Sequence, residues 1–111
     1  IPIALGSASK NARRILKQVN LTHYFDAIVD GTVVTKAKPD PQVFLTAAKQ
    51  LNSKPQNCVV FEDSVAGVQA ANAAEMLSIG IGNTSVLNEA NYVFSDFTEI
   101  SQNFLEKLLN Q

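Results

Sequence analysis

The sequence has 111 residues, of which 46% are apolar, and this size and composition fit one folded domain with its own core. Its nine basic and ten acidic residues give a net charge of −1 without any run of like charges, which argues against binding to nucleic acid or to an anionic membrane. The single cysteine, Cys58, excludes a disulfide framework and favours a reducing cytoplasm, and these residues contain neither a membrane-length apolar run nor a secretory leader.

Short apolar runs recur along the chain, and their length predicts strands rather than helices. The predicted strands cover residues 1–5, 27–30, 58–61, 77–82 and 92–94. Because the chain opens directly on the first strand and lacks a starting Met, we expect its natural N-terminus to lie elsewhere.

Apolar residues at helical spacing separate several of these strands. The predicted helices cover residues 12–19, 43–51 and 65–74. Ser101 is expected to cap a last helix that carries Phe104. Strands that are apolar on both faces and alternate with helices indicate a parallel sheet covered on both sides. The predicted fold is therefore a three-layer α/β/α, Rossmann-like domain, in which Tyr24 and Phe61 are expected to be core or helix-packing residues.

In such sheets ligands bind beyond the carboxyl ends of the strands, so function is expected at the strand-to-helix turns. The first turn reads LGSASKN, residues 5–11. Ser7 or Ser9 would serve as an ordinary N-cap of the next helix. Alternatively, these hydroxyls together with Lys10 and Asn11 form an anion site, because a helix N-terminus offers unpaired amides and partial positive charge.

The second turn reads KAKPDP, residues 36–41. Pro39 restricts Lys38 to an extended backbone, which fixes the direction of the lysine side chain. The simpler interpretation is a solvated lysine before a helix, and Lys36 fits that interpretation.

The third turn places two carboxylates, Glu62 and Asp63, at the end of a buried strand. Asp63 or Ser64 would cap the following helix while Glu62 points into water. Alternatively, a cation offsets the repulsion and desolvation of the two charges. Oxygen ligands of this kind suit Mg²⁺, so the three turns together predict a crevice that holds magnesium and a phosphoryl group, with Lys38 beside the carboxylates.

The order of these residues resembles the haloacid dehalogenase (HAD) superfamily of phosphotransferases. The resemblance rests on Ser7, Lys38 before Pro39, the stretch 62–64 (EDS) and Gly67, and it covers nearly the whole chain. Within the superfamily the stretches SASKN, NLTHYFDAIVDG, KPDPQVFLTAA and EDSVAGVQAA look closest to the β-phosphoglucomutases. Those enzymes interconvert β-glucose 1-phosphate and glucose 6-phosphate through an aspartyl-phosphate.

The resemblance implies a role for each turn. Ser7 and Lys38 would be catalytic, since they would bind and neutralise the transferred phosphoryl group. Glu62 and Asp63 would hold Mg²⁺, with Asp63 as a direct ligand. The implied substrate phosphate contacts are Ser7, Ala8, Ser9, Lys10, Asn11 and Lys38. The contacts of Ser9 to Asn11 favour a mutase, because a mutase must hold a bisphosphate intermediate by either end.

The sequence also departs from the family pattern. The family's nucleophile is the first Asp of an Asp-x-Asp motif on an earlier strand, and neither that motif nor the helical cap occurs in this chain. Residues 1–111 therefore resemble the C-terminal portion of a HAD-like core, and we expect this portion alone to be inactive. In the family the nucleophile strand lies between the strands represented by residues 1–5 and 58–61. Its absence would leave two apolar edges that pair with the missing N-terminal segment or with another copy.

Two alternatives to a mutase stay open. A sugar-phosphate phosphatase of the same superfamily would share Ser7, Lys38, Glu62 and Asp63 and would need only one phosphate site. A non-catalytic doubly wound module would be expected to carry an acidic cluster after the first strand, where this chain has the hydroxyl-rich GSAS.

Overall fold

The computed structural model describes residues 1–7 and 9–109. All of the predicted strands are present. They are β1 (Ala4–Gly6), β2 (Ala27–Val29), β3 (Val59–Glu62), β4 (Leu77–Ile81) and β5 (Tyr92–Phe94). The predicted helices are also present, as α1 (Ala12–Gln18), α2 (Gln42–Gln50), α3 (Val65–Ala73) and α4 (Gln102–Leu109). The predicted cap of the last helix is confirmed, since the Phe104 amide donates to the Ser101 hydroxyl at 3.1 Å.

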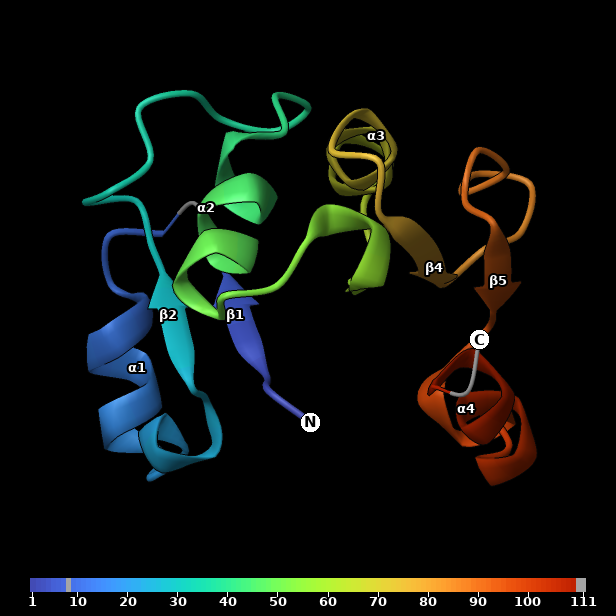
Figure 1. Cartoon of the computed structure of the whole chain (residues 1–111), viewed down its shortest axis with the longest axis horizontal. Helices are drawn as coiled ribbons and strands as arrows, with labels where there is room; N and C mark the ends of the chain where they lie inside the picture. Colours follow the sequence, from blue (N-terminus) through green and yellow to red (C-terminus); the bar gives the residue numbers. More distant parts are fainter. Residues whose placement is uncertain (8, 110–111) are drawn as a thin grey trace.

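Every strand pair in the described chain is parallel, but the strands form two sheets rather than one. β1 pairs with β2, so that Gly6 lies opposite Val29, and β3, β4 and β5 form the second sheet. Figure 1 shows β1 and β2 on the left and β4 and β5 on the right. Within residues 1–7 and 9–109 no strand pairs with the free edge of β1 or of β3.

The two sheets are held together by helices that share one core. α2 packs on β1 and β2, and α3 packs on β3 and β4. The buried core side chains of these elements include Val29, Val43, Phe44, Ala47, Val60, Ala70, Ala71 and Met76. Ala70 and Ala71 of α3 have no exposed surface, and their small side chains let α3 lie close to the rest of the core. Burial of each larger apolar side chain contributes about 1.5–3 kcal/mol, which holds the halves side by side without strand pairing.

A cavity of about 580 Å³ lies between the facing edges of β1 and β3. Leu5 and Gly6 line it from β1, and Phe61 and Glu62 line it from β3. Phe61 is 42% exposed and faces the cavity, so a core position for this ring is wrong in the described chain, although its centre lies 5.9 Å from that of Phe97 in the short 3-10 helix Phe97–Glu99. Tyr24, for which a core or helix-packing position was also expected, is 62% exposed and lies against the neighbouring ring of His23.

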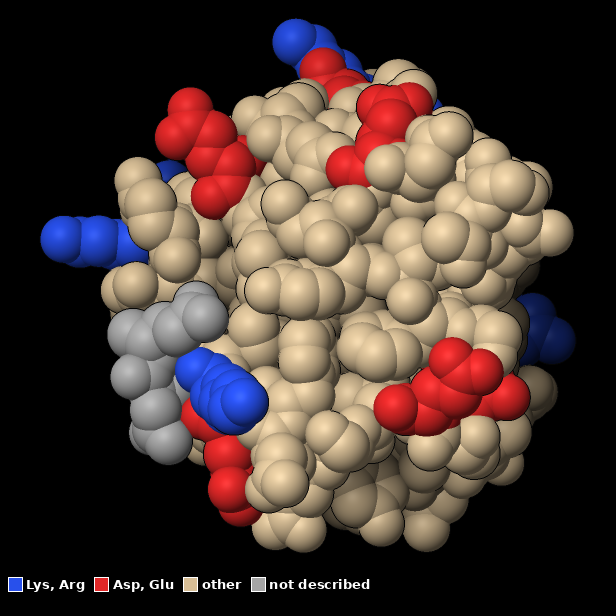
Figure 2. All heavy atoms as spheres, turned by 90° about the vertical axis from the view of Figure 1, so that its right-hand side faces the viewer, with Lys and Arg blue, Asp and Glu red and all other residues tan. Residues whose placement is uncertain are grey.

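Charged side chains are scattered over the face that carries β5 and α4. Figure 2 shows Lys and Arg side chains separated from one another and interspersed with Asp and Glu near the rim, while uncharged residues form the centre of this face. No helix in the described part of the chain combines the length and apolar character needed to cross a membrane.

Candidate functional site

The predicted meeting of Lys38 with the carboxylate turn is present in the structure. Lys38 lies on the loop between β2 and α2, and Glu62 is the last residue of β3. The Lys38 Nζ atom is 2.7 Å from Glu62 Oε2, and the two side chains are only 20% and 9% exposed. The geometry on which the predicted site depends is therefore present, and the interpretation of Lys38 as a solvated surface lysine is wrong. Lys36, by contrast, is exposed, as expected.

The second oxygen of the Glu62 carboxylate binds the start of α3. Glu62 Oε1 accepts hydrogen bonds from the backbone amides of Asp63 and Ser64, at 3.0 and 3.2 Å, and from the Ser64 hydroxyl at 3.2 Å. Burial alone would raise the pKa of Glu62, but the hydrogen bond and charge of Lys38 outweigh burial and lower it. Glu62 thus stays ionised and does not point into water.

Ser64 is the N-cap of α3, as one of the simpler interpretations of this turn predicted. Its hydroxyl accepts a hydrogen bond from the Gly67 amide at 3.0 Å. Gly67 in turn leaves room for the carboxylate, because a Cβ atom at this position would lie 2.0 Å from Glu62 Cδ. A glycine in the first turn of a helix, five residues after a carboxylate, is the sequence signal for this close approach.

The side chain of Asp63 is exposed and lines the same cavity as Glu62. Among the described residues no ion pair engages its carboxylate, which leaves it available to bind a cation. No group of three or more His, Cys, Asp and Glu side chains in residues 1–7 and 9–109 forms a metal site by itself. The donor set nevertheless fits Mg²⁺, which commonly takes one or two carboxylates and completes its shell with water and phosphate oxygens.

The hydroxyl turn lies at the carboxyl end of β1, and Ser7 and Ser9 line the cavity with Lys38 and Asp63. The Ser7 oxygen accepts the Ser9 amide at 3.1 Å, and the Ser9 oxygen accepts the Asn11 amide at 3.1 Å. The N-cap of α1 is Asn11 itself, so neither serine has the predicted N-cap role. Because both hydroxyls accept these bonds through oxygen, their protons are left to donate.

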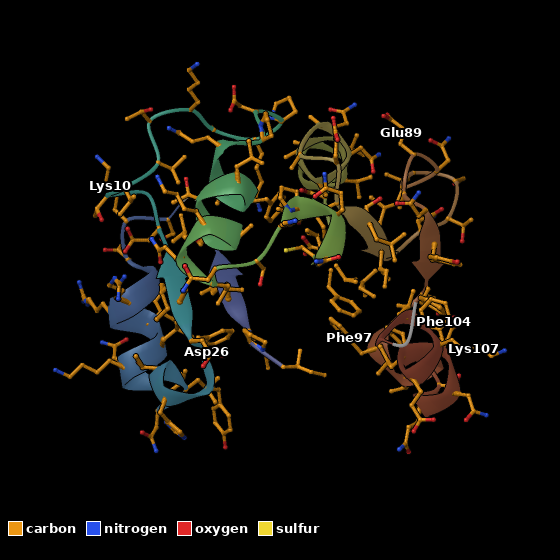
Figure 3. All side chains as sticks on the ribbon, viewed as in Figure 1. Lys10, Asp26, Glu89, Phe97, Phe104 and Lys107 are labelled. Atoms are coloured by element: carbon orange, nitrogen blue, oxygen red, sulfur yellow. The ribbon has the colours of Figure 1, made fainter. Side chains whose placement is uncertain are left out.

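Two of the backbone amides expected to bind an anion at this turn, those of Ser9 and Asn11, are thus already paired. The donors left for an anion are the serine hydroxyls together with the side chains of Lys10 and Asn11, which are exposed. Figure 3 shows Lys10 beyond the carboxyl ends of β1 and β2, on the outer side of the molecule. Ala8, the remaining predicted phosphate contact, lies outside the described residues.

A buried carboxylate that sequence reasoning missed supports the hydroxyl turn. Asp30, 2% exposed, accepts hydrogen bonds from the amide and hydroxyl of Thr32, and its Oδ2 lies 3.4 Å from Arg13 Nε. The bonds from Thr32, followed by the charge of Arg13, lower the pKa of Asp30. The next residue, Gly31, donates its amide to the Ser9 carbonyl at 3.1 Å. The end of β2 therefore fixes the backbone of the turn; an Asp at the end of a buried strand was the available signal.

Comparison with known proteins shows that this chain is similar to sugar-phosphate enzymes. The family model described as haloacid dehalogenase-like hydrolase matches residues 2–75. The β-phosphoglucomutase of Bacillus subtilis is 37% identical over 107 residues, which cover 96% of this chain and 47% of that protein. The fructose-1-phosphate phosphatase of Escherichia coli is 42% identical over 82 residues, which cover 72% of this chain and 44% of the phosphatase.

A solved structure extends the similarity to the fold. The crystal structure of β-phosphoglucomutase from Clostridium difficile superposes with a TM-score of 0.92 and 40% identity, covering 99% of this chain and 49% of that one. The predicted α/β fold is thus confirmed, with the strands of the described residues in two parallel sheets flanked by helices. The chain spans about half the length of the relatives it matches.

Proposed function

The chain belongs to the haloacid dehalogenase-like hydrolase family, and from this membership we propose that the complete protein is a magnesium-dependent phosphotransferase acting on a sugar phosphate, with β-phosphoglucomutase activity as the specific reaction. The observation that carries the proposal is the 2.7 Å contact between Lys38 and Glu62 at a cavity that Ser7 and Asp63 also line. The contact and the shared cavity together place a cation, a hydroxyl donor and two carboxylates from three separate turns beside one another.

Each group has a physical task in phosphoryl transfer. The transferred phosphoryl group spreads negative charge over its equatorial oxygens as the reaction proceeds. The Ser7 hydroxyl donates a hydrogen bond to one of these oxygens, and the Lys38 ammonium neutralises the developing charge. Fixed donors and charges in a partly buried site stabilise the transition state more than water would, because they need no reorganisation during the reaction.

Magnesium would be held by Asp63, whose carboxylate lines the cavity. Glu62 would be a second ligand, or it would contact the groups that bind the ion without binding the ion itself. When bound, the ion supplies positive charge that draws the phosphate oxygens into place and offsets the charge of the two carboxylates. The lowered pKa of Glu62 supports this assignment, because a carboxylate binds Mg²⁺ in its ionised form.

The exposed side chains of Lys10 and Asn11, together with the Ser9 hydroxyl, are the groups assigned to a second phosphate position, which a mutase needs and a simple hydrolase does not. They would bind the non-reacting phosphate of a sugar bisphosphate while the other phosphate is transferred. A mutase needs both positions because its intermediate must be held by either end as it turns round.

The nucleophile would come from a segment outside this sequence. The cavity between β1 and β3 has a free strand edge on each side, and a strand inserted there would end beside Ser7, Lys38 and Asp63. We assign the aspartate nucleophile to such a strand, by resemblance to the family. The 111 residues alone are then expected to bind phosphate without turnover.

The test is an assay of the complete protein with β-glucose 1-phosphate, with and without a glucose 1,6-bisphosphate primer. A mutase converts the substrate to glucose 6-phosphate and responds to the primer. Release of free phosphate without glucose 6-phosphate would reject the mutase and favour a phosphatase. The similarity to a fructose-1-phosphate phosphatase is the observation that favours this second candidate.

The free cysteine supports a cytoplasmic location for the protein. Cys58 is partly buried, its thiol donates to the Lys54 carbonyl, and burial raises its pKa. A thiol in this setting is unreactive and suits a reducing compartment.

A further inference from the structure

The loop that carries Lys38 is fixed by a glutamine from the helix that follows it. Gln42 is the first residue of α2, and its side chain folds back over the loop. Gln42 Oε1 accepts the backbone amides of Thr35 and Lys36, at 2.8 and 2.7 Å. Its Nε2 atom donates to the Thr35 hydroxyl at 3.0 Å, and the backbone amide of Gln42 donates to the Asp40 carboxylate at 2.9 Å. One side chain thus holds the backbone just before Lys38.

A buried aromatic ring from the same helix lies against the ammonium itself. The Lys38 Nζ atom is 5.1 Å from the centre of the Phe44 ring, and Phe44 is only 8% exposed. A cation within about 6 Å of an aromatic face is attracted by the ring's negative face. The stem of a lysine is flexible, so its ammonium stays in one place only where several fixed groups hold it. Here Glu62 holds it on one side and the ring on another.

We propose that Gln42 and Phe44 are positioning residues for Lys38: Gln42 fixes the loop backbone, and the Phe44 ring keeps the ammonium at the cavity. The inference rests on the proposed function, in which Lys38 neutralises the transferred phosphoryl group. It adds that α2, which contributes no group to the reacting atoms, determines how well Lys38 performs this task.

The first test compares Gln42→Ala and Phe44→Leu with the wild type in the complete protein, using steady-state turnover of β-glucose 1-phosphate. Loss of the hydrogen bonds or of the ring should lower kcat by about 3- to 30-fold. KM should change little, because Lys38 acts mainly in the transition state. Gln42→Glu keeps an oxygen for the two amides and Phe44→Tyr keeps the ring, so both should restore most of the rate.

The control for lost packing is Phe104→Leu, the same exchange on α4, where the ring packs against Tyr92 and Phe94. It should leave kcat unchanged. A second measurement follows the acylation of Lys38 by an amine reagent through mass spectrometry, and this rate should rise several-fold in Gln42→Ala and Phe44→Leu. An unchanged acylation rate would overturn the proposal even if kcat fell.

Repeating both substitutions in a Lys38→Met background separates positioning from a general structural role. Once the lysine is gone, Gln42→Ala and Phe44→Leu should have no further effect on the residual rate. Equal losses in both backgrounds would overturn the positioning role while leaving the proposed function intact. If Lys38→Met alone kept the full rate, the proposed function itself would fail, and this inference with it.

Discussion

At Gly67 the absence of a side chain lets the Glu62 carboxylate lie against the first turn of α3. We predict that Gly67→Ala in the complete protein displaces Glu62, because the new methyl group would overlap its Cγ and Cδ atoms at 2.1 and 2.0 Å. The ion pair with Lys38 would be lost, and activity should fall about 100-fold, the effect of losing one transition-state donor. The measurement is kcat together with the thermal unfolding midpoint.

Gly80→Ala is the matched control for this substitution. Gly80 lies opposite Glu62 in the pairing of β4 with β3, but the three atoms nearest to a methyl group at Gly80 belong to Leu87 and Ala90, with Leu87 Cβ at 3.1 Å, so the methyl group crowds the loop after β4 rather than the Glu62 carboxylate. It should lower the unfolding midpoint without a comparable loss of kcat. Equal activity losses at both positions would show that Gly67 matters for packing only.

A second prediction at the residue scale concerns the pH dependence of stability. The folded pKa of Asp30 is lower than its ordinary value of 3.8, so its ionised form stabilises the fold. This contribution is fully present above pH 3.8 and is lost as the pH falls through the folded pKa. The unfolding free energies of wild type and Asp30→Asn should therefore differ by a constant amount from neutral pH down to pH 3.8, and converge below it.

Urea unfolding at a series of pH values measures this difference. Thr32→Val is the informative companion, because the Thr32 hydroxyl is the main cause of the lowered pKa. Its removal should move the convergence to higher pH. A difference that already shrinks well above pH 3.8 in the wild type would contradict the direction assigned to the pKa of Asp30.

At the scale of single elements, two helices within residues 9–109 begin with a serine cap, and one of these two caps borders the site. Ser64 caps α3 and also donates to Glu62, whereas Ser101 caps α4. Replacing either serine by alanine should destabilise the complete protein by about 1 kcal/mol, the usual cost of a lost N-cap. Only Ser64→Ala should also lower kcat, since it removes one of the three hydrogen bonds that Glu62 Oε1 accepts. Chemical denaturation of both variants measures the loss of stability, and the turnover assay measures kcat. A loss of kcat in both variants, or in neither, would contradict a link between the Ser64 cap and the site.

The elements themselves could be predicted because they depend on periodic patterns. Strands β1 to β5 follow short apolar runs, and the helices follow apolar residues at helical spacing. The contact of Lys38 with Glu62 was predictable because the carboxyl ends of parallel strands share an edge. The contacts of Gln42 were not predictable, because hydrogen bonds between a side chain and a nearby backbone leave no periodic trace. The pair of Arg13 with Asp30 was not predictable either, because it joins two side chains from separate elements and depends on how those elements pack.

The exposure of Phe61 was missed for a different reason. An aromatic residue in an apolar run predicts burial, and whether burial occurs depends on which elements are present to cover the ring. In this chain the ring lines the cavity between the two sheets. The same dependence applies to Phe97, which is 63% exposed, lines the same cavity, and is seen beside α4 in Figure 3.

For the whole molecule, the free edges of β1 and β3 make a specific prediction about association. The cavity of about 580 Å³ has a strand edge on each side and exposed rings at its walls, so a further strand could pair with both edges there. Unpaired edges with apolar surface promote association with other chains. We therefore expect the isolated 111-residue chain to self-associate as its concentration rises, whereas the complete protein should not associate through these edges.

Analytical ultracentrifugation of the isolated chain, of Phe61→Lys and of Val86→Lys tests this expectation. Both substitutions place a lysine on an exposed apolar position, 42% and 55% exposed respectively, but only Phe61 lines the cavity. A charge at Phe61 should weaken association because it opposes burial of the edge, and a charge at Val86 should leave association unchanged. A well-folded monomer at every concentration, or equal effects of the two lysines, would mean that the cavity edges do not drive association.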